Sequence, residues 1–304
     1  MKVFHHLKEA ATQVQSCVVA IGNFDGVHRG HQSLLKELVK DADSQGVEAV
    51  VLTFFPHPVE VLHPEKKLER LTTTSEKLSL LGDYGVSSAL VQTFDKSLAE
   101  LTPAEFVNHF FVTGLKAKSV HVGNNFCFGK NRSGTTAVLA RLCEAQGIKL
   151  FAAKEVATDG TKIGSSEIRR LVAAGKVEEA AVHLGRPYFL TGNVRHGDKR
   201  GRTIGFPTAN LHVPSDKILP KNGVYAVQVH WQNESYRAIA NVGVRPTFEE
   251  ASPQRLVEVH IFDFNHKIYD EFLEVEFIRF IRDEKKFPSL DALKAQIQED
   301  IQKA

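Results

Sequence analysis

The chain has 304 residues, of which 42% are hydrophobic and 24% charged, and its formal net charge is +2. This length predicts about two domains, and the composition is near the globular average, which excludes disordered and fibrous proteins. So small a net charge gives no overall attraction to nucleic acid or to an anionic membrane, and we expect neither as a partner.

The N-terminal segment MKVFHHLKEAATQVQS has no apolar signal-peptide core, and no later apolar run approaches the length of a membrane span. We therefore expect a cytoplasmic protein. Cys17, Cys127 and Cys143 are spaced neither as a disulfide framework nor as a zinc site, so we expect reduced thiols. Most of the fourteen histidines also lack the spacing of metal ligands.

Strands and helices are expected to alternate through the first half. The apolar run at 17–21 predicts a buried strand, and a helix is expected at 30–40 with three leucines on one side. Further apolar runs lie between helix-compatible segments, at 49–55, 88–91, 120–122 and 148–152. This alternation predicts an α/β fold with a doubly wound parallel sheet.

Two short helices are expected at 165–175 and 177–185, before Pro187. We place the domain boundary there, which gives domains of residues 1–186 and 187–304. Short alternating runs follow, at 224–230, 237–242, 256–262 and 273–280. They predict a small antiparallel β-barrel. A C-terminal helix is expected to pack on this barrel, with Ser289 as its N-cap and an apolar stripe of Leu290, Leu293, Ile297 and Ile301.

The segment GNFDGVHRGH, from Gly22 to His31, lies between the first strand and the first helix, where open α/β sheets commonly bind phosphates. His28 and His31 are three residues apart, so both imidazoles can face a phosphate at the helix N-terminus. Gly30 allows close backbone approach. Such donors would stabilise the charge that develops when the α-phosphate of an ATP-like nucleotide is attacked. The alternative is that both histidines only satisfy backbone groups of the loop.

A second phosphate-binding element is predicted at GSSEIR, residues 164–169. Ser165 and Ser166 place two hydroxyls at a helix N-terminus, and Arg169 follows one turn later, so the three could hold a triphosphate. The alternative is an ordinary serine N-cap.

The segment GNVRHGDKRGRTIGFPTAN, residues 192–210, is too rich in glycine and basic residues for a strand interior. We interpret it as a loop that covers phosphates, and the alternative is a solvated surface. Thr208 and Asn210 provide hard oxygen ligands of the kind that Mg²⁺ accepts. The glycines and cations expected to contact a nucleotide are Gly197, Lys199, Gly201, Arg202 and Gly205.

In the run VEVHIFDF, residues 257–264, period-two alternation places Glu258 on the face opposite Val257 and Val259. A carboxylate at a barrel mouth could accept the proton of an attacking hydroxyl during phosphoryl transfer. The alternative is an exposed glutamate paired with a nearby base.

Together these segments resemble the bacterial bifunctional riboflavin kinase/FMN adenylyltransferase family, also called FAD synthetases, over essentially the whole chain. The segments that add to the resemblance are TFFPHP at 53–58, VGNNFCFGK at 122–130, GFPTAN at 205–210 and NVGVRPT at 241–247.

The resemblance implies a Rossmann-like, nucleotidyltransferase-type first domain that joins FMN to AMP from ATP and releases pyrophosphate. It implies a second domain that phosphorylates riboflavin with ATP, and both steps would use Mg²⁺. His28 and His31 would stabilise the ATP phosphates, Thr208 and Asn210 would coordinate Mg²⁺, and Glu258 would be the base. The remaining nucleotide- or flavin-binding residues would be Gly22, Phe24, Asp25, Gly30, Phe54, Asn125, Ser165, Ser166, Arg169 and Arg245.

Two departures from the family pattern fall in the first domain. The family usually reads SSTxIR where this chain has GSSEIR, and the acidic and basic positions of its GxDFRFG stretch are Asn125 and Cys127 here. We expect an altered affinity or rate and not a loss of activity.

Two rival functions remain open. A related nucleotidyltransferase could use another acceptor, because the histidine loop alone does not select it. A flavin-binding regulator could have kept the fold without catalysis. The oligomeric state is also left open.

Overall fold

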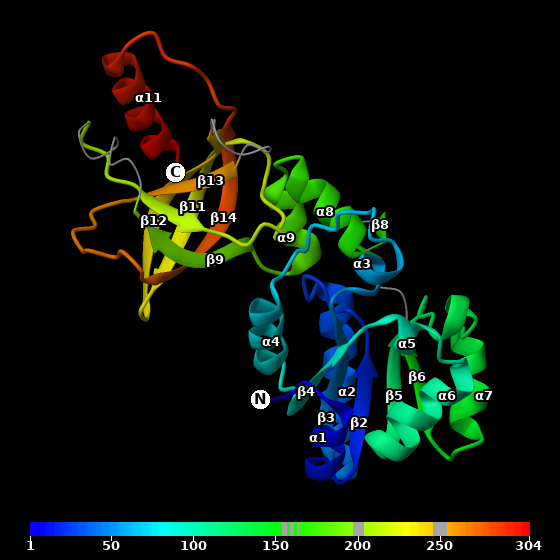
Figure 1. Cartoon of the computed structure of the whole chain (residues 1–304). Helices are drawn as coiled ribbons and strands as arrows, with labels where there is room; N and C mark the ends of the chain where they lie inside the picture. Colours follow the sequence, from blue (N-terminus) through cyan, green and yellow to red (C-terminus); the bar gives the residue numbers. More distant parts are fainter. Residues whose placement is uncertain (154–156, 159–160, 163, 197–203, 246–253) are drawn as a thin grey trace. The chain divides into compact units, whose positions relative to one another are not determined.

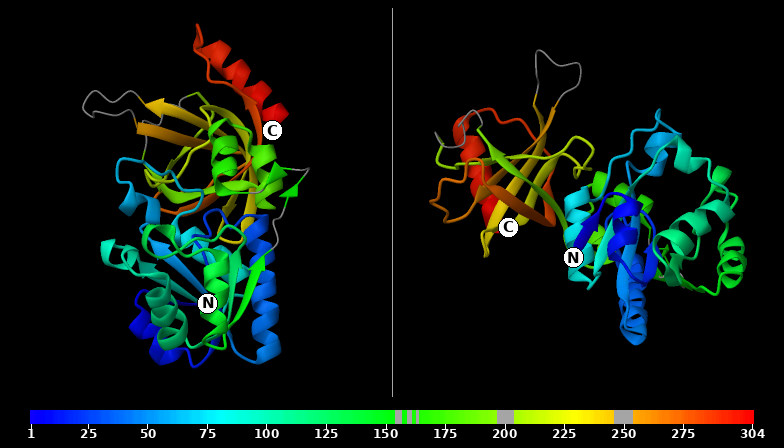
Figure 2. Two further views of the ribbon diagram at one scale, coloured as in Figure 1. Left: turned by 90° about the vertical axis from the view of Figure 1, so that its right-hand side faces the viewer. Right: turned by 60° about the horizontal axis from the view of Figure 1, so that its bottom comes forward.

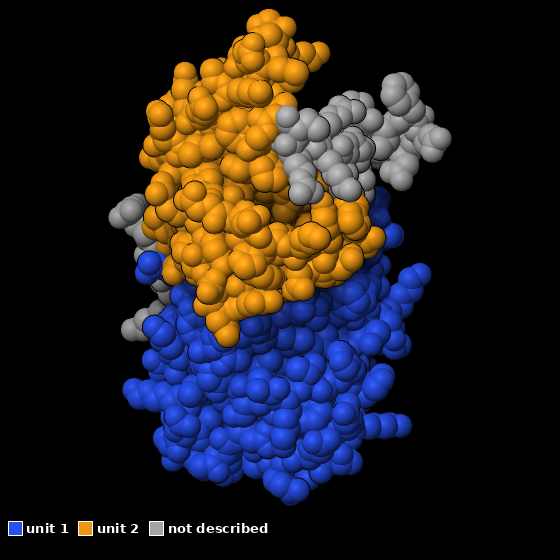
Figure 3. Space-filling model, turned by 90° about the vertical axis from the view of Figure 1, so that its left-hand side faces the viewer, with its two compact units in different colours: residues 1–68, 72–164 blue, residues 69–71, 165–304 orange. Residues whose placement is uncertain are grey.

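The structure is a computed structural model and describes residues 1–153, 157–158, 161–162, 164–196, 204–245 and 254–304 (Figure 1). It divides into two compact units, each described here by itself (Figure 3). Unit 1 comprises residues 1–68 and 72–164, and unit 2 comprises residues 69–71 and 165–304.

Unit 1 is built on a parallel sheet in the strand order β1-β4-β3-β2-β5-β6. Its strands are β1 (Lys2–Phe4), β2 (Cys17–Ile21), β3 (Glu48–Phe55), β4 (Ser88–Thr93), β5 (Ala117–Gly123) and β6 (Lys149–Ala153). The parallel sheet expected from the sequence is therefore confirmed. The edge strand β1 was not predicted, because three residues are too few to show a period.

Helices cover both faces of this sheet. They are α1 (Leu7–Gln13), α2 (Arg29–Gln45), α3 (Pro58–Leu62), α4 (Thr74–Asp83), α5 (Lys96–Ala99), α6 (Pro103–Phe106) with a π-helical continuation (Val107–Gly114), a 3₁₀ turn (Lys130–Arg132) and α7 (Thr136–Glu144). In β2, Val19 and Ile21 join a core with α1, α6 and α7, whereas Val18 and Ala20 join a second core with α2 and α4. Two apolar faces on one strand explain its continuous hydrophobic run and confirm the doubly wound arrangement.

Unit 2 contains a closed antiparallel barrel in the order β10-β13-β12-β11-β14-β9 (Figure 2). Its strands are β9 (Tyr188–Arg195), β10 (Ala209–His212), β11 (Gly223–Trp231), β12 (Glu234–Arg245), β13 (Gln254–Ile261) and β14 (Phe272–Arg282). The interior is apolar, with Val229, Ala240 and Leu273 fully buried among its side chains. The predicted antiparallel barrel is confirmed.

One expectation within the barrel was wrong. Residues 192–210 were excluded from strands, yet β9 contains Gly192 and β10 begins at Ala209. Gly192 is buried where the two strands approach closely, and a Cβ there would clash with the backbone oxygen of His212. The glycine therefore permits the strand pairing and does not break it.

Helices α8 (Ser165–Ala173) and α9 (Val177–Leu184) belong to unit 2. Helix α9 packs on β9 and β14, and the backbone of Lys221 donates to the carbonyl of Val172 at 3.3 Å. The compact units therefore divide at residue 164, whereas the functional boundary expected after residue 186 stays a prediction.

Residues 69–71 also belong to unit 2. The backbone N–H of Arg70 donates to the carbonyl of Asp216 at 2.6 Å, and its guanidinium pairs with the Asp216 carboxylate at 3.1 Å. Buried Lys217 donates to the carbonyl of Leu71 at 2.7 Å. These bonds attach a segment from the first half of the chain to the start of the barrel.

The C-terminal helix α11 (Leu290–Lys303) begins as predicted, because the Ser289 hydroxyl accepts the N–H of Ala292 at 3.2 Å. Of the expected apolar stripe, Leu290 is 64% exposed, whereas Leu293, Ile297 and Ile301 are half-buried. In addition, buried Asp300 accepts two hydrogen bonds of 3.0 and 2.7 Å from the guanidinium of Arg282 on β14. Across the described part of the chain, every helix is too short or too polar to cross a membrane.

Candidate active sites

The first candidate site lies where the strand order of the unit 1 sheet reverses. From β2 the chain proceeds to β3 and β4 on one side, and then returns to place β5 on the other side of β2. The connections leaving β2 and β5 therefore diverge at their carboxyl ends, which is where open α/β sheets bind ligands. The segment Gly22 to His31 follows β2, and Asn125 follows β5.

The loop after β2 is tightly folded. Phe24, Gly26 and Val27 have positive φ angles of 51°, 81° and 38°, and the side chains of Phe24 and Val27 are fully buried. Asp25 is also buried, and its carboxylate accepts hydrogen bonds from the N–H and hydroxyl of Thr72 at 3.1 and 3.2 Å. The side chains of Phe24 and Asp25 thus hold the loop, and any ligand contact of Phe24 must come from its backbone.

His28 and His31 meet at the start of α2. Their rings stack with centroids 3.7 Å apart, and Nδ1 of His28 accepts the N–H of His31 at 3.3 Å as the N-cap of the helix. In its neutral form His28 therefore carries its proton on Nε2. A Cβ at Gly30 would lie 3.2 Å from the His28 ring, so this glycine makes room for the histidine. The structure brings the two histidines together as the sequence predicted.

His31 is held in its neutral form. Burial, the nearby His28 and the Lys77 ammonium lower its pKa well below the ordinary value of 6.5. Its Nδ1 is buried and, within the described residues, has no hydrogen-bond partner. A buried polar atom in this state is costly and is commonly satisfied by a ligand or water.

Lys77 on α4 was missed by the sequence analysis. Its side chain is buried, and Nζ donates to the carbonyl of Asn23 at 3.2 Å and to the hydroxyl of Thr53 at 3.1 Å. The Asn23 amide also lies 2.9 Å from Nε2 of His57. A lysine four residues before buried Leu81 on a helix was the available signal, because that spacing places it on the apolar face.

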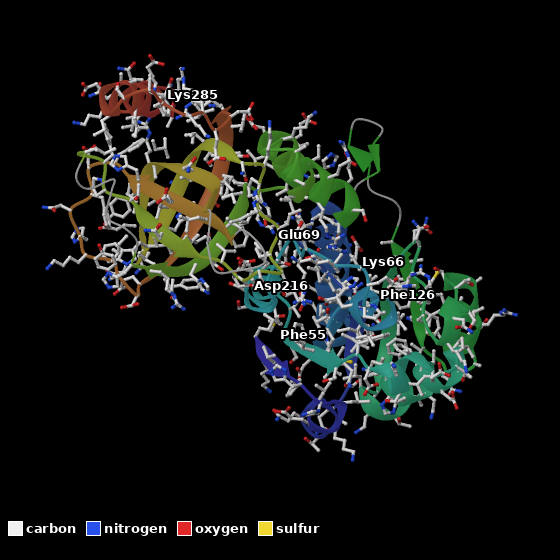
Figure 4. The ribbon with its side chains drawn as sticks, turned by 45° about the horizontal axis from the view of Figure 1, so that its top comes forward. Phe55, Lys66, Glu69, Phe126, Asp216 and Lys285 are labelled. Carbon is white, nitrogen blue, oxygen red and sulfur yellow. The ribbon has the colours of Figure 1, made fainter. Side chains whose placement is uncertain are left out.

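Aromatic side chains occur at the neighbouring strand ends. Phe54 on β3 packs edge-on against Phe94 with centroids 5.7 Å apart. Phe126, which is labelled in Figure 4, stacks on Phe128 at 5.5 Å. Asn125 is exposed in the turn closed by the Phe126 N–H and the Gly123 carbonyl. Flat, partly exposed rings of this kind can hold a planar ligand.

Ser165, Ser166 and Arg169 lie in the first turns of α8, as predicted. Ser166 is exposed, and the other two are half-buried. The helix belongs to unit 2, whereas His28 and His31 belong to unit 1, so the shared role of these residues stays a prediction.

The second candidate site is a row of polar residues across four barrel strands. Asn210 on β10 is paired with both Arg195 on β9 and Glu258 on β13, and Glu258 is paired with Asn241 on β12. Residues directly opposite each other place their Cβ atoms about 5 Å apart on one face. The row therefore gathers two amides, a carboxylate and a guanidinium, of which Arg195 and Asn241 were not among the predicted site residues.

Glu258 points away from the barrel interior. Its neighbours Val257 and Val259 are each 1% exposed, whereas Glu258 is half-buried on the opposite face. The alternation read from the sequence is confirmed, but the carboxylate lies on the outer wall of the barrel and does not face its interior. Strand register could not be read from the sequence, and it is what brings Asn241 beside Glu258.

Thr208 is exposed immediately before β10 and two residues from Asn210. Gly205 adopts a positive φ of 93°, as a turn glycine does. Arg245 ends β12. Gly197, Lys199, Gly201 and Arg202 lie outside the described residues, and so does the side chain of Arg245.

The donor set beside Glu258 fits a magnesium ion. The Thr208 hydroxyl, the Asn210 amide oxygen and the Glu258 carboxylate are oxygen donors, which Mg²⁺ prefers together with nucleotide phosphates.

Comparison with known families assigns both halves of the chain. Residues 10–167 match the family model for FAD synthetase, and residues 184–304 match the model for riboflavin kinase. The chain therefore belongs to the bifunctional riboflavin kinase/FMN adenylyltransferase family. Its FAD synthetase part comes first and its riboflavin kinase part second, and it is a kinase and a nucleotidyltransferase.

Individual relatives carry the same two activities in their names. The Bacillus subtilis bifunctional riboflavin kinase/FMN adenylyltransferase is 38% identical over 99% of this chain and 94% of its own length. The Haemophilus influenzae protein of that name is 38% identical over 100% and 98%. The Escherichia coli K12 protein is 37% identical over 97% and 93%.

A solved structure shares the whole architecture. The crystal structure of a Streptococcus pneumoniae protein described as a macrolide-efflux protein matches with a TM-score of 0.87 and 34% identity, over 99% of this chain and 97% of that one. The efflux description belongs to that protein. The two family matches on this chain are those of enzymes of flavin metabolism.

Proposed function

We propose that the barrel row carries out the kinase step and that the loop after β2 carries out the adenylyl-transfer step. The observation that carries the first assignment is the cross-strand register of Asn210, Glu258 and Asn241. The observation that carries the second is the stacked pair of His28 and His31 at the N-terminus of α2.

In the kinase step, a riboflavin hydroxyl attacks the γ-phosphorus of ATP. The new O–P bond forms as the bond to the β-phosphate oxygen breaks, and ADP leaves. Glu258 accepts the proton of the hydroxyl. Thr208 and Asn210 hold Mg²⁺, which neutralises charge on the phosphates when bound. Arg195, at the end of the row, adds a further positive charge.

In the adenylyl-transfer step, a phosphate oxygen of FMN attacks the α-phosphorus of a second ATP, and pyrophosphate leaves. His28 donates from Nε2, and the N-terminus of α2 adds positive potential. His31 contributes a neutral imidazole whose Nδ1 is buried. Asn125 and Phe54 hold flavin or nucleotide, and Ser165, Ser166 and Arg169 hold the triphosphate. Gly22, Gly30 and the backbone of Phe24 shape the same loop.

The proposal is tested by incubating the protein with riboflavin, ATP and Mg²⁺ and separating the flavins by chromatography over time. FMN that appears before FAD supports both assignments, and removal of Mg²⁺ by a chelator should stop both steps. FMN without FAD would indicate that the departures at Gly164, Asn125 and Cys127 disable adenylylation. Tight flavin binding with no conversion would favour a regulator instead. The cytoplasmic location stays a prediction.

A further inference from the structure

His260 lies on β13 two residues after Glu258 and therefore on the same outer face of the barrel. Its Nδ1 is 2.8 Å from the carbonyl oxygen of Pro207, the residue before Thr208. The bond joins the strand that carries the proposed base to the segment that carries the proposed metal ligands.

The direction of this hydrogen bond follows from its acceptor. A proline carbonyl can only accept, so the proton lies on Nδ1 of His260. Two aromatic rings flank the imidazole, Phe206 at 5.5 Å and Phe262 at 5.8 Å between centroids. The donor atom is therefore held toward Pro207 by its neighbours.

The strand pairing explains why a side chain is needed there. The ladder between β10 and β13 ends with Ala209 opposite Val259, so Thr208 lies beyond it at the level of His260. Pro207 has no N–H with which to continue a ladder. The imidazole bonds the Pro207 carbonyl instead, and so ties the chain to β13 on the far side of Thr208.

We propose that His260 is a positioning residue of the kinase site, which fixes the Thr208 segment against the strand of Glu258. The inference rests on the proposed function of Thr208 and Glu258. Without this bond, residues 204–208 lose a direct tie to β13, and the Thr208 hydroxyl is no longer held at one distance from the carboxylate. Displacements of about 1 Å in a catalytic group can cost about 100-fold in rate.

The experiment compares His260→Ala with His260→Asn in the full chain. An asparagine amide can place a donor close to the position of Nδ1, so it should keep the bond that alanine removes. We expect His260→Ala to lower the kcat of FMN formation at least about 10-fold and to raise the Mg²⁺ concentration needed, with little change in the KM for riboflavin. His260→Asn should recover most of the rate. His212→Ala, which removes an exposed histidine from β10, is the matched control.

A second measurement does not depend on activity. Hydrogen exchange of the amides at 204–206 and 208–211, in protein without ligands, should be faster in His260→Ala and near wild type in His260→Asn. The fluorescence of Trp231, the single tryptophan and part of β11, checks that the barrel is folded. Unchanged exchange in His260→Ala, or equal damage in both variants, would overturn the inference. If the wild-type protein formed no FMN while the two variants showed the expected exchange pattern, only the proposed function would be overturned.

Discussion

Lys77 donates a hydrogen bond from its buried ammonium to the hydroxyl of Thr53 at 3.1 Å, beneath the loop that carries His28 and His31. The same nitrogen donates to the carbonyl of Asn23 at 3.2 Å. The buried, charged Lys77 side chain therefore holds both the start of the loop, through Asn23, and the end of β3, through Thr53.

Replacement of Lys77 by methionine should weaken adenylyl transfer, because the loop loses its charged donor and the phosphates lose a nearby positive charge. Hydrogen bonds from charged groups contribute about 1.5–3 kcal/mol, which corresponds to a fall of roughly 10- to 100-fold in kcat/KM for ATP. The measurement is FAD formation from supplied FMN. Lys36→Met, which alters an exposed lysine of α2, should leave that rate unchanged. Equal rates for Lys77→Met and wild type would show that the lysine has no such role.

The two steps should be separable by mutation. Glu258→Gln should lower FMN formation from riboflavin by about 100-fold or more, because the base is lost, while FAD formation from supplied FMN continues. His31→Ala should give the opposite pattern and accumulate FMN. Each variant is thereby the folding control for the other. If both substitutions reduced both activities equally, the assignment of one step to each site would be wrong.

The sequence predicted those features that depend on neighbours along the chain, and it missed those that depend on strand pairing. The run at 17–21, the cap at Ser289 and the pair His28 and His31 follow from local periodicity and spacing. Asn241 and Arg195 join the polar row only through barrel register, which the sequence does not contain. Gly192 was misread for the same reason, since its close approach to β10 is a tertiary contact.

The neutral state of His31 predicts a pH-dependent stability. The folded pKa lies well below 6.5, so as pH falls below 6.5 the unfolded chain binds a proton that the folded one does not. The free energy of unfolding should therefore decrease as pH falls, by up to about 1.4 kcal/mol per pH unit from this group. Urea unfolding of wild type and His31→Gln between about pH 5 and pH 8 isolates the contribution of His31. The contributions of the other titrating groups cancel when the two unfolding free energies are subtracted. A difference that does not vary with pH would contradict it.

Gly192→Ala should destabilise the barrel, because the added Cβ would clash with the backbone of His212 where β9 meets β10. Backbone cannot move aside as a side chain can, so we expect a loss of at least about 2 kcal/mol and of kinase activity. Thermal unfolding followed by Trp231 fluorescence measures it. Gly164→Ala is the matched control, since no atom of the described residues lies within 4 Å of a Cβ there and unfolding should be unchanged. A stable Gly192→Ala barrel would mean that the strands can separate locally.

The cysteines offer a chemical probe of the turn after β5. Burial raises the pKa of Cys17 to about 12 and that of Cys143 to about 11, so near pH 8 both are almost entirely thiols. Cys127 is half-buried in the segment between the stacked rings of Phe126 and Phe128. A disulfide reagent should therefore modify one thiol rapidly in the native protein and three in urea, and Cys127→Ser should abolish the rapid reaction.

The same labelling can test whether a ligand binds at the turn after β5. If flavin or nucleotide binds beside Asn125, saturating FMN with ATP and Mg²⁺ should slow the modification of Cys127 without changing the total of three in urea. Riboflavin alone, which is the substrate of the other step, is the control and should protect less. Equal reactivity with and without FMN would place the flavin away from the turn, and the departures at Asn125 and Cys127 would then have no direct bearing on adenylyl transfer.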